Sequence, residues 1–131
     1  MSDMSIEEDI RRFIAVNITS IPHLECLLLF HRNQNEEWDV KDVARQLYIS
    51  EKNAMGLLEL LSESKFLTII IRENIPLYKY DPDSPEKIDL VNRLEKAYSI
   101  NLIPITRMIH AKTEAVSKIQ QFADAFKLRK D

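Results

Sequence analysis

The sequence predicts a mainly α-helical protein with a small antiparallel β-hairpin. Its 131 residues include one glycine, far below the usual share of about 7%, and 45% of the residues are hydrophobic. Most apolar residues recur every three or four positions, as on one face of a helix, whereas the segment from Leu67 to Tyr80 is rich in β-branched and aromatic residues. This length corresponds to one domain, and the apolar content is ample for a core.

Two short helices separated by a tight turn are predicted at the centre of the chain. Asp39 can cap the first helix, and Asp42 lies in its first turn, where the helix dipole is positive. Ser50 can cap the second helix, directly after the turn. The residues expected to face the core are Val40, Val43, Ala44 and Leu47 in the first helix and Ala54, Leu57, Leu58 and Leu61 in the second.

A β-hairpin is predicted directly after these helices. Its first strand is Leu67–Ile71, its polar tip is residues 72–74, and its return strand is Leu77–Tyr80. Alternation along the first strand places Ile69 on the same, buried face as Leu67 and Ile71. Trp38 is expected to begin a short extended segment that pairs with the hairpin as a third strand. Two helices followed by a hairpin make a winged helix-turn-helix.

Additional helices are predicted on both sides of this unit. The N-terminal helix is expected to begin with a capping box of Ser5 and Glu8 and to pack either on its own chain or on a partner subunit. Ser20 can cap the next helix. After the hairpin, Ser84 and Pro85 predict a helix start, and an interruption is expected at residues 101–103. Pro104 is expected to open another helical turn that extends to Ile109, and a separate final helix is expected at residues 113–130. The chain therefore divides into an N-terminal helix (1–19), a winged helix-turn-helix (20–82) and C-terminal helices (83–131), in one compact domain overall.

The central segment also resembles a known family. The residues that carry the likeness are VKDVARQLYISEKNAMGLLELLSESKFL and the hairpin that follows them. They are similar to the winged-helix modules of bacterial transcriptional regulators, broadly of the MarR kind. The resemblance extends from about Ser20 to Pro82, about half of the chain, and implies a regulator that binds duplex DNA. Winged helices also serve as protein-binding modules, so the fold alone does not decide the function.

Charge argues against DNA and in favour of a protein partner as an alternative. The net charge of the chain is −3, and the second central helix carries three acidic residues against one basic residue. Because phosphate neutralisation supplies most non-specific DNA affinity, such a helix is a poor electrostatic match to DNA. An acidic helix would suit a basic protein partner, which makes a winged-helix adaptor the second hypothesis. The candidate DNA-binding residues are Lys41, Arg45, Lys52, Asn53 and Arg72.

The terminal helices carry a second functional signal, a candidate homodimer interface. Aromatic and aliphatic side chains at helical spacing are typical of helix contacts, either within a chain or between chains. Both alternatives remain open from the sequence. The candidate interface residues are Ile10, Phe13, Phe122 and Phe126.

The sequence contains little that indicates a catalytic site, and no cofactor is expected. His23 and Cys26 are three residues apart, but no second pair of metal ligands follows, so Cys26 is interpreted as a small core residue. A single glycine cannot form a Gly-rich phosphate-binding loop. No apolar run reaches the length of a membrane helix, the N-terminus has no signal-peptide pattern, and one cysteine fits a reducing cytosol. We therefore expect a cytoplasmic, non-enzymatic protein without a membrane partner.

Overall fold

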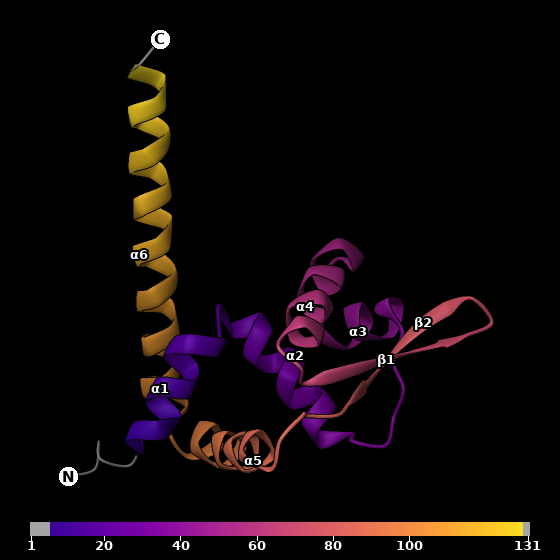
Figure 1. Cartoon of the computed structure of the whole chain (residues 1–131). Coiled ribbons are helices and arrows are strands. Elements are labelled where there is room, and N and C mark those ends of the chain that lie inside the picture. The colour runs from indigo at the N-terminus through magenta and orange to yellow at the C-terminus, as the bar shows by residue number, and fades with distance from the viewer. Residues whose placement is uncertain (1–5, 130–131) are drawn as a thin grey trace.

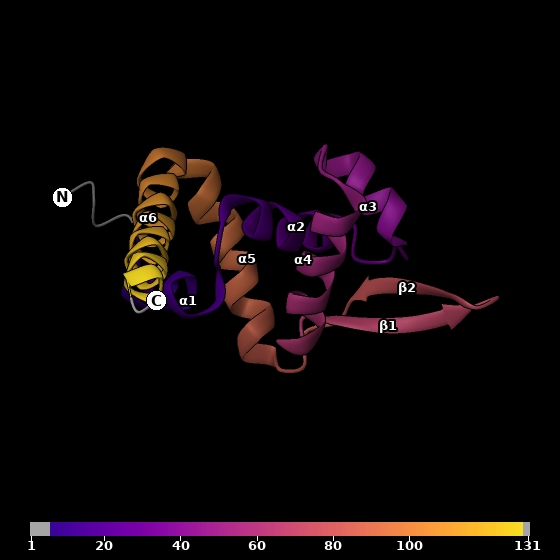
Figure 2. The same cartoon turned by 90° about the horizontal axis from the view of Figure 1, so that it is seen from above.

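Six helices and one β-hairpin make up the part of the chain that this computed structural model describes, which is residues 6–129, with side chains as far as residue 115. The helices are α1 (Glu8–Asn17), α2 (Ile21–Arg32), α3 (Val40–Leu47), α4 (Glu51–Glu63), α5 (Pro85–Ile100) and α6 (Leu102–Arg129), and the strands are β1 (Leu67–Arg72) and β2 (Ile75–Tyr80). Figures 1 and 2 show α1 and α6 at one end of the molecule and the hairpin projecting at the other. The predicted winged helix-turn-helix with added terminal helices is confirmed.

Polar side chains define where the central helices begin. The Asp39 carboxylate accepts a hydrogen bond from the Asp42 amide at 2.8 Å, and the Asp42 carboxylate accepts one from the Asp39 amide at 3.4 Å. The Ser50 hydroxyl accepts the amide of Asn53 at 3.0 Å and thereby caps α4. Ser20 and Ser84 cap α2 and α5 in the same way, as predicted. Each cap satisfies an amide that has no partner within its own helix.

The start of α1 differs from the prediction. Glu7 occupies the cap position and forms no side-chain cap hydrogen bond, and the helix begins at Glu8. Ser5, the predicted cap, lies outside the described residues. Instead, α1 is held by its neighbours, because the guanidinium of Arg93 on α5 contacts the carboxylates of Glu7 at 2.6 Å and Asp9 at 2.7 Å.

The core surrounds α2, whose side chains are buried on several sides. Residues fully buried along it are Leu24, Cys26, Leu27, Leu28 and Phe30. From one side α4 contributes all four of its predicted inward residues, and from the other α1 contributes Ile10, Phe13 and Ile14. The ring of Phe13 meets that of Phe66, which follows α4, edge to face at 5.8 Å. The N-terminal helix therefore packs on its own chain, which was one of the two predicted alternatives.

The hairpin is longer than predicted, and only its base is buried. Its loop consists of Glu73 and Asn74, both with positive φ as in a type I′ turn, so β2 already begins at Ile75. Leu67 pairs with Tyr80 across the strands and Ile69 pairs with Tyr78, so these four side chains lie on one face of the sheet. On this face Leu67, Tyr78 and Tyr80 are buried. The prediction that Ile69 and Ile71 are buried is wrong, because the hairpin extends past the core and leaves them 49% and 63% exposed.

Trp38 pairs with the hairpin through a single bridge rather than a full strand. The amide of Trp38 donates to the carbonyl of Tyr78 at 2.9 Å, and the amide of Tyr78 donates back at 2.8 Å. The indole meets the Phe30 ring edge to face at 6.2 Å, with the planes inclined by 64°. The partly buried Trp38 therefore connects the hairpin to α2.

The C-terminal segment forms one helix where two were predicted. Asn101 separates α5 from α6, but α6 then runs without a break from Leu102 to Arg129. Pro104 lies in its first turn, where the missing N–H has no intrahelical partner to lose. No Gly or further Pro occurs between Met108 and Thr113, so nothing in this stretch ends the helix. Figure 1 shows the C-terminal half of α6 standing clear of the other elements.

Trp38 provides a first test of this arrangement. Truncation of Trp38 to alanine removes the contact with Phe30 and should lower the free energy of unfolding by about 3 kcal/mol, at the low end for a Trp because the side chain is only partly buried. Urea unfolding followed by circular dichroism measures this difference. Tyr48→Ala is the matched control, since Tyr48 is 94% exposed and its truncation should change stability by no more than about 0.5 kcal/mol. Equal stability of the two variants would refute the placement of Trp38.

His23 is the one polar residue that is buried among the described side chains, with 2% of its surface exposed. Its Nδ1 accepts the backbone amide of Thr19 at 3.0 Å, so the proton of the neutral ring is on Nε2. Burial, together with the smaller effect of the positive charge of Lys112, lowers the pKa of His23 to about 4. The ammonium of Lys112 itself donates to the carbonyl of Ile18 at 2.7 Å, beyond the end of α1.

The lowered pKa of His23 makes stability depend on pH in a defined direction. Below about pH 6.5 the unfolded chain binds a proton at His23 that the folded chain does not bind until about pH 4. Stability contributed by the neutral ring is therefore complete above pH 6.5 and is lost as the pH falls toward 4, with a loss of about 2 kcal/mol between pH 7 and pH 5. Comparing urea unfolding of the wild type and His23→Gln at both pH values isolates this contribution. A stability difference between the two proteins that is the same at both pH values would contradict it.

Candidate functional site

The exposed face of α4 lies between α3 and the hairpin. Opposite the buried stripe of α4, helical spacing places an outward stripe of Lys52, Gly56, Glu59 and Glu63, all of them exposed. The helix carries a net charge of −2, as its sequence indicated. Gly56 is unusual here, because a mid-helix glycine is about 1 kcal/mol less favourable than alanine.

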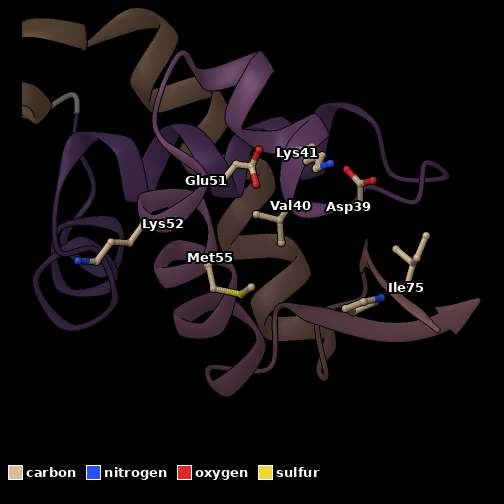
Figure 3. A pocket seen from close by; sticks show the side chains of 8 residues that line it. Asp39, Val40, Lys41, Glu51, Lys52, Met55 and Ile75 are labelled. Carbon is tan, nitrogen blue, oxygen red and sulfur yellow. The ribbon is translucent and has the colours of Figure 1, made fainter.

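A groove runs along this face, between the two central helices and the start of β2. Its volume is about 610 Å³, and the residues that line it are Asp39, Val40, Lys41, Glu51, Lys52, Met55, Ile75 and Pro76. Figure 3 shows Met55 and Ile75 approaching the hollow from α4 and β2, with Val40 between them. The sequence analysis did not find this groove, because Met55 and Ile75 come from separate elements that only the fold brings together. Both are partly exposed, at 40% and 49%.

The predicted cations fall into two groups. Lys41 and Lys52 are exposed at the rim of the groove and form no ion pair within the described side chains. Figure 3 shows the ammonium of Lys52 pointing away from the hollow, toward solvent. Arg45 has a side chain that is 71% exposed and lies 3.6 Å from the carboxylate of Asp42, one turn earlier on α3. Asn53, the predicted base reader, is exposed in the first turn of α4.

Arg72, at the end of β1, is neutralised by a carboxylate from another part of the chain. Its Nε and Nη2 donate to the two oxygens of Glu37 at 2.7 and 2.8 Å. This hydrogen bonding lowers the pKa of the Glu37 carboxyl and raises that of the arginine. The sequence placed Arg72 as a free wing cation, and it contained no signal for this partner 35 residues away. A phosphate must compete with Glu37 for the same guanidinium.

The turn between α3 and α4 contains a strained and exposed aromatic residue. Tyr48 has φ 57° and ψ 46°, in the left-handed region, where a non-glycine residue costs roughly 1–2 kcal/mol. Its side chain is 94% exposed, so no packing within the described chain offsets this cost. Tyr48 therefore lies at the surface in the turn that precedes α4, beside Ile21 and Pro22 at the start of α2.

The residues considered for metal binding are part of the core. His23 and Cys26 are both buried on α2, and burial raises the pKa of the Cys26 thiol to about 12, so it is not a reactive thiolate at neutral pH. Over the described residues, no group of three or more His, Cys, Asp or Glu side chains could hold a metal ion. Within the same part of the chain, no single helix is long and apolar enough to cross a membrane, and only the pair α1–α2, bent by 111°, meets the length and composition required.

Two of the four predicted interface residues are buried within their own chain, and the other two lie outside the described side chains. Ile10 and Phe13 are 1% and 6% exposed inside their own chain, so their side chains leave no surface for a second subunit. Phe122 and Phe126 lie beyond the described side chains. Other apolar side chains of the terminal helices are exposed instead, and the most exposed are Val16 (73%), Ile100 (77%), Leu102 (51%) and Ile103 (61%). The run of apolar residues around Asn101 was the signal in the sequence that could have identified them.

No family model matches this chain, and comparison with curated proteins also finds no match. Solved structures do match. MepR, a transcription regulator of the Staphylococcus aureus multidrug efflux pump MepA, aligns over 99% of this chain and 92% of its own, with 12% identity and a TM-score of 0.55. A MepR mutant bound to an oligodeoxyribonucleotide aligns over 99% of this chain and 91% of its own, with 13% identity and a TM-score of 0.53.

A third similar structure is the heme sensor protein PefR from Streptococcus agalactiae, in complex with heme. It aligns over 87% of this chain and 82% of its own, with 18% identity and a TM-score of 0.52. The structural neighbours are MarR-family regulators, not enzymes. At identities this low the likeness establishes a shared fold, and it confirms the MarR-like winged-helix module predicted from residues 20–82.

Proposed function

We propose that this protein is a non-enzymatic transcriptional regulator that binds duplex DNA through α4 and the wing, which is the hairpin β1–β2. The observation that carries the proposal is the fold itself, which aligns over nearly its whole length with a regulator structure bound to an oligodeoxyribonucleotide. In a winged helix-turn-helix the second helix of the pair enters the major groove, with its N-terminal residues nearest to the bases. In this chain those residues are Lys52 and Asn53, which are exposed.

The proposed contacts are few and lie on α3, in the first turn of α4 and on the wing. Lys41 and Lys52 supply unpaired ammonium groups, and Arg45 supplies a guanidinium that is only weakly paired with Asp42. Arg72 is available on the wing after a phosphate displaces Glu37, which is a modest cost because the arginine side chain is 59% exposed. Each phosphate neutralised contributes about 0.9 to the slope of log affinity against log salt. Four cations in each subunit therefore predict a slope of about 3.6 per subunit, and the three carboxylates of α4 oppose this attraction.

We also propose that the regulator acts as a homodimer built from the terminal helices. The C-terminal half of α6 projects from the body of the chain (Figure 1), and its sequence places apolar residues at helical spacing, including Phe122 and Phe126. Within the described side chains, Ile100, Leu102 and Ile103 at the junction of α5 and α6 are exposed. Exposed apolar side chains gathered in this way are typical of a subunit interface.

A second candidate function, a winged-helix adaptor that binds another protein, is favoured by the groove. The face that should meet DNA contains an apolar hollow lined by Val40, Met55 and Ile75, whereas a DNA-binding face is normally polar and basic. The acidic residues Glu51, Glu59 and Glu63 on α4 would pair with a basic protein and repel phosphate.

Titration of labelled genomic DNA fragments at low salt tests the DNA hypothesis. The double variant Lys52→Glu, Arg72→Glu should bind more weakly than the wild type, with a salt slope lower by about two units per subunit because two phosphate contacts are lost. The matched control is Arg11→Glu, Lys65→Glu, which makes the same charge change at two exposed positions, on α1 and after α4, and should bind as the wild type does. Equal, weak binding by all three proteins would rule out DNA as the ligand of this face.

The same assay separates the two candidate functions through the acidic residues. If DNA is the ligand, Glu59→Lys should bind DNA as tightly as the wild type or more tightly, because it removes a negative charge from α4. If a protein is the ligand, reversing Glu51, Glu59 and Glu63 should abolish partner binding while the fold, measured by circular dichroism, is unchanged. Strong DNA binding by the wild type together with neutral or tighter binding by Glu59→Lys would exclude the adaptor.

Sedimentation at micromolar concentration tests the homodimer. The wild type should sediment at twice the monomer mass of 15.4 kDa, whereas Ile100→Glu, Ile103→Glu should shift toward monomer because it places charges in an apolar interface. Ile69→Glu, Ile71→Glu is the matched control, since it changes two exposed isoleucines on the wing and should leave the dimer intact. A wild-type protein that sediments as a monomer would remove the homodimer and, with it, recognition of two DNA half-sites.

A further inference from the structure

Gly56 is the single glycine of the chain, and nothing in the described structure requires a glycine at this position. Its backbone is helical with negative φ, so it does not use the conformations that only glycine adopts freely. A Cβ built on Gly56 would meet no atom within 4 Å, so an alanine would not clash with the rest of the described chain. Alanine would also be the better helix former. The absence of a side chain therefore weakens α4 without any benefit to packing inside the protein.

Gly56 lies at the middle of the exposed face of α4. The centre of the buried stripe is near Ala54 and Leu61, and Gly56 lies on the opposite side of the helix. One turn before it is Lys52, and about one turn after it is Glu59, so Gly56 lies between a basic and an acidic part of the same stripe. Any macromolecule that meets this face of α4 at its centre meets bare backbone there.

We propose that the backbone of α4 at Gly56 is in direct van der Waals contact with the DNA, and that glycine sets how deeply the helix enters the major groove. This inference rests on the proposed DNA-binding function. A helix with its side chains is about 10–12 Å across, and the major groove is about 12 Å wide, so one side chain on the outermost stripe decides the depth of insertion. The first two turns of α4, with Lys52 and Asn53, enter the groove.

The charges along α4 fit the same geometry. Glu59 and Glu63 lie in the C-terminal half of the helix and are repelled by phosphates, so that half tilts out of the groove. Gly56 lies where the inserted half ends. With few cations to supply electrostatic affinity, close contact over the inserted half becomes a larger share of binding. A Cβ at Gly56 would lift the whole helix and lengthen every contact made by Lys52 and Asn53.

A series of side chains at position 56 tests this inference by giving opposite signs for stability and binding. Gly56→Ala should raise the melting temperature by about 4 °C, because alanine favours the helix and meets open space. The same substitution should weaken binding to a duplex DNA fragment about tenfold, and Gly56→Leu should weaken it further. The salt slope should stay at the wild-type value, because no charge changes.

Ser62→Ala is the matched control on the same helix. The Ser62 hydroxyl is buried without a hydrogen-bond partner and lies on the flank of α4, outside the outward stripe, so its removal should stabilise α4 and leave DNA affinity unchanged. If the wild type binds DNA and Gly56→Ala is more stable but binds equally well, the inference is wrong although the proposed function stands. A Gly56→Ala protein that is less stable would also overturn it, by showing that the fold itself needs the glycine. Absence of DNA binding by the wild type would overturn the proposed function together with the inference.

Discussion

The burial of α2 is the constraint on which the rest of the structure depends. Leu24 and Cys26 are fully enclosed, and at helical spacing they point in nearly opposite directions, so elements must pack around α2 from several directions. The helix pair α3–α4, the base of the hairpin, α5 and α6 all pack on α2, and α1 packs on α5 and α6. Burial of apolar surface drives this arrangement, at roughly 25 cal/mol per Å² removed from water. The candidate DNA-binding face and the terminal helices are therefore two sides of one core.

Polar contacts at the C-terminal end of α2 connect these two sides more specifically. The Glu95 carboxylate on α5 accepts hydrogen bonds from the Arg32 guanidinium at 2.9 and 2.6 Å and contacts the His31 ring at 3.2 Å. The same His31 ring meets Tyr80, at the end of β2, edge to face at 5.7 Å. Packed side chains therefore join α5, the C-terminal end of α2 and the base of the wing.

The fold favours DNA as the partner of this protein, whereas the acidic residues of α4 favour a basic protein. The structure adds two observations that count against DNA. The wing arginine that the sequence offered to DNA is held by Glu37, and the groove beside α4 is largely apolar. What remains for DNA is a small set of cations on α3 and in the first turn of α4. Close steric fit would then matter more than charge, which is why the bare backbone at Gly56 is informative: it is a feature that costs helix stability and has no use inside the chain.

The sequence by itself determined where most elements begin and which face of each central helix is inside. These features are local: Asp39 and Ser50 cap amides three residues away, and the inward residues of α4 repeat at helical spacing. Features that depend on distant parts of the chain were decided only by the tertiary structure. The alternation of residues along the strand could not show that the hairpin extends beyond the core and leaves Ile69 exposed. The number of charged residues could not show that Arg72 pairs with Glu37. The spacing of apolar residues placed Ile10 on the apolar face of its helix. Only the packing of α1 on its own chain decided that this side chain is buried there rather than against a partner.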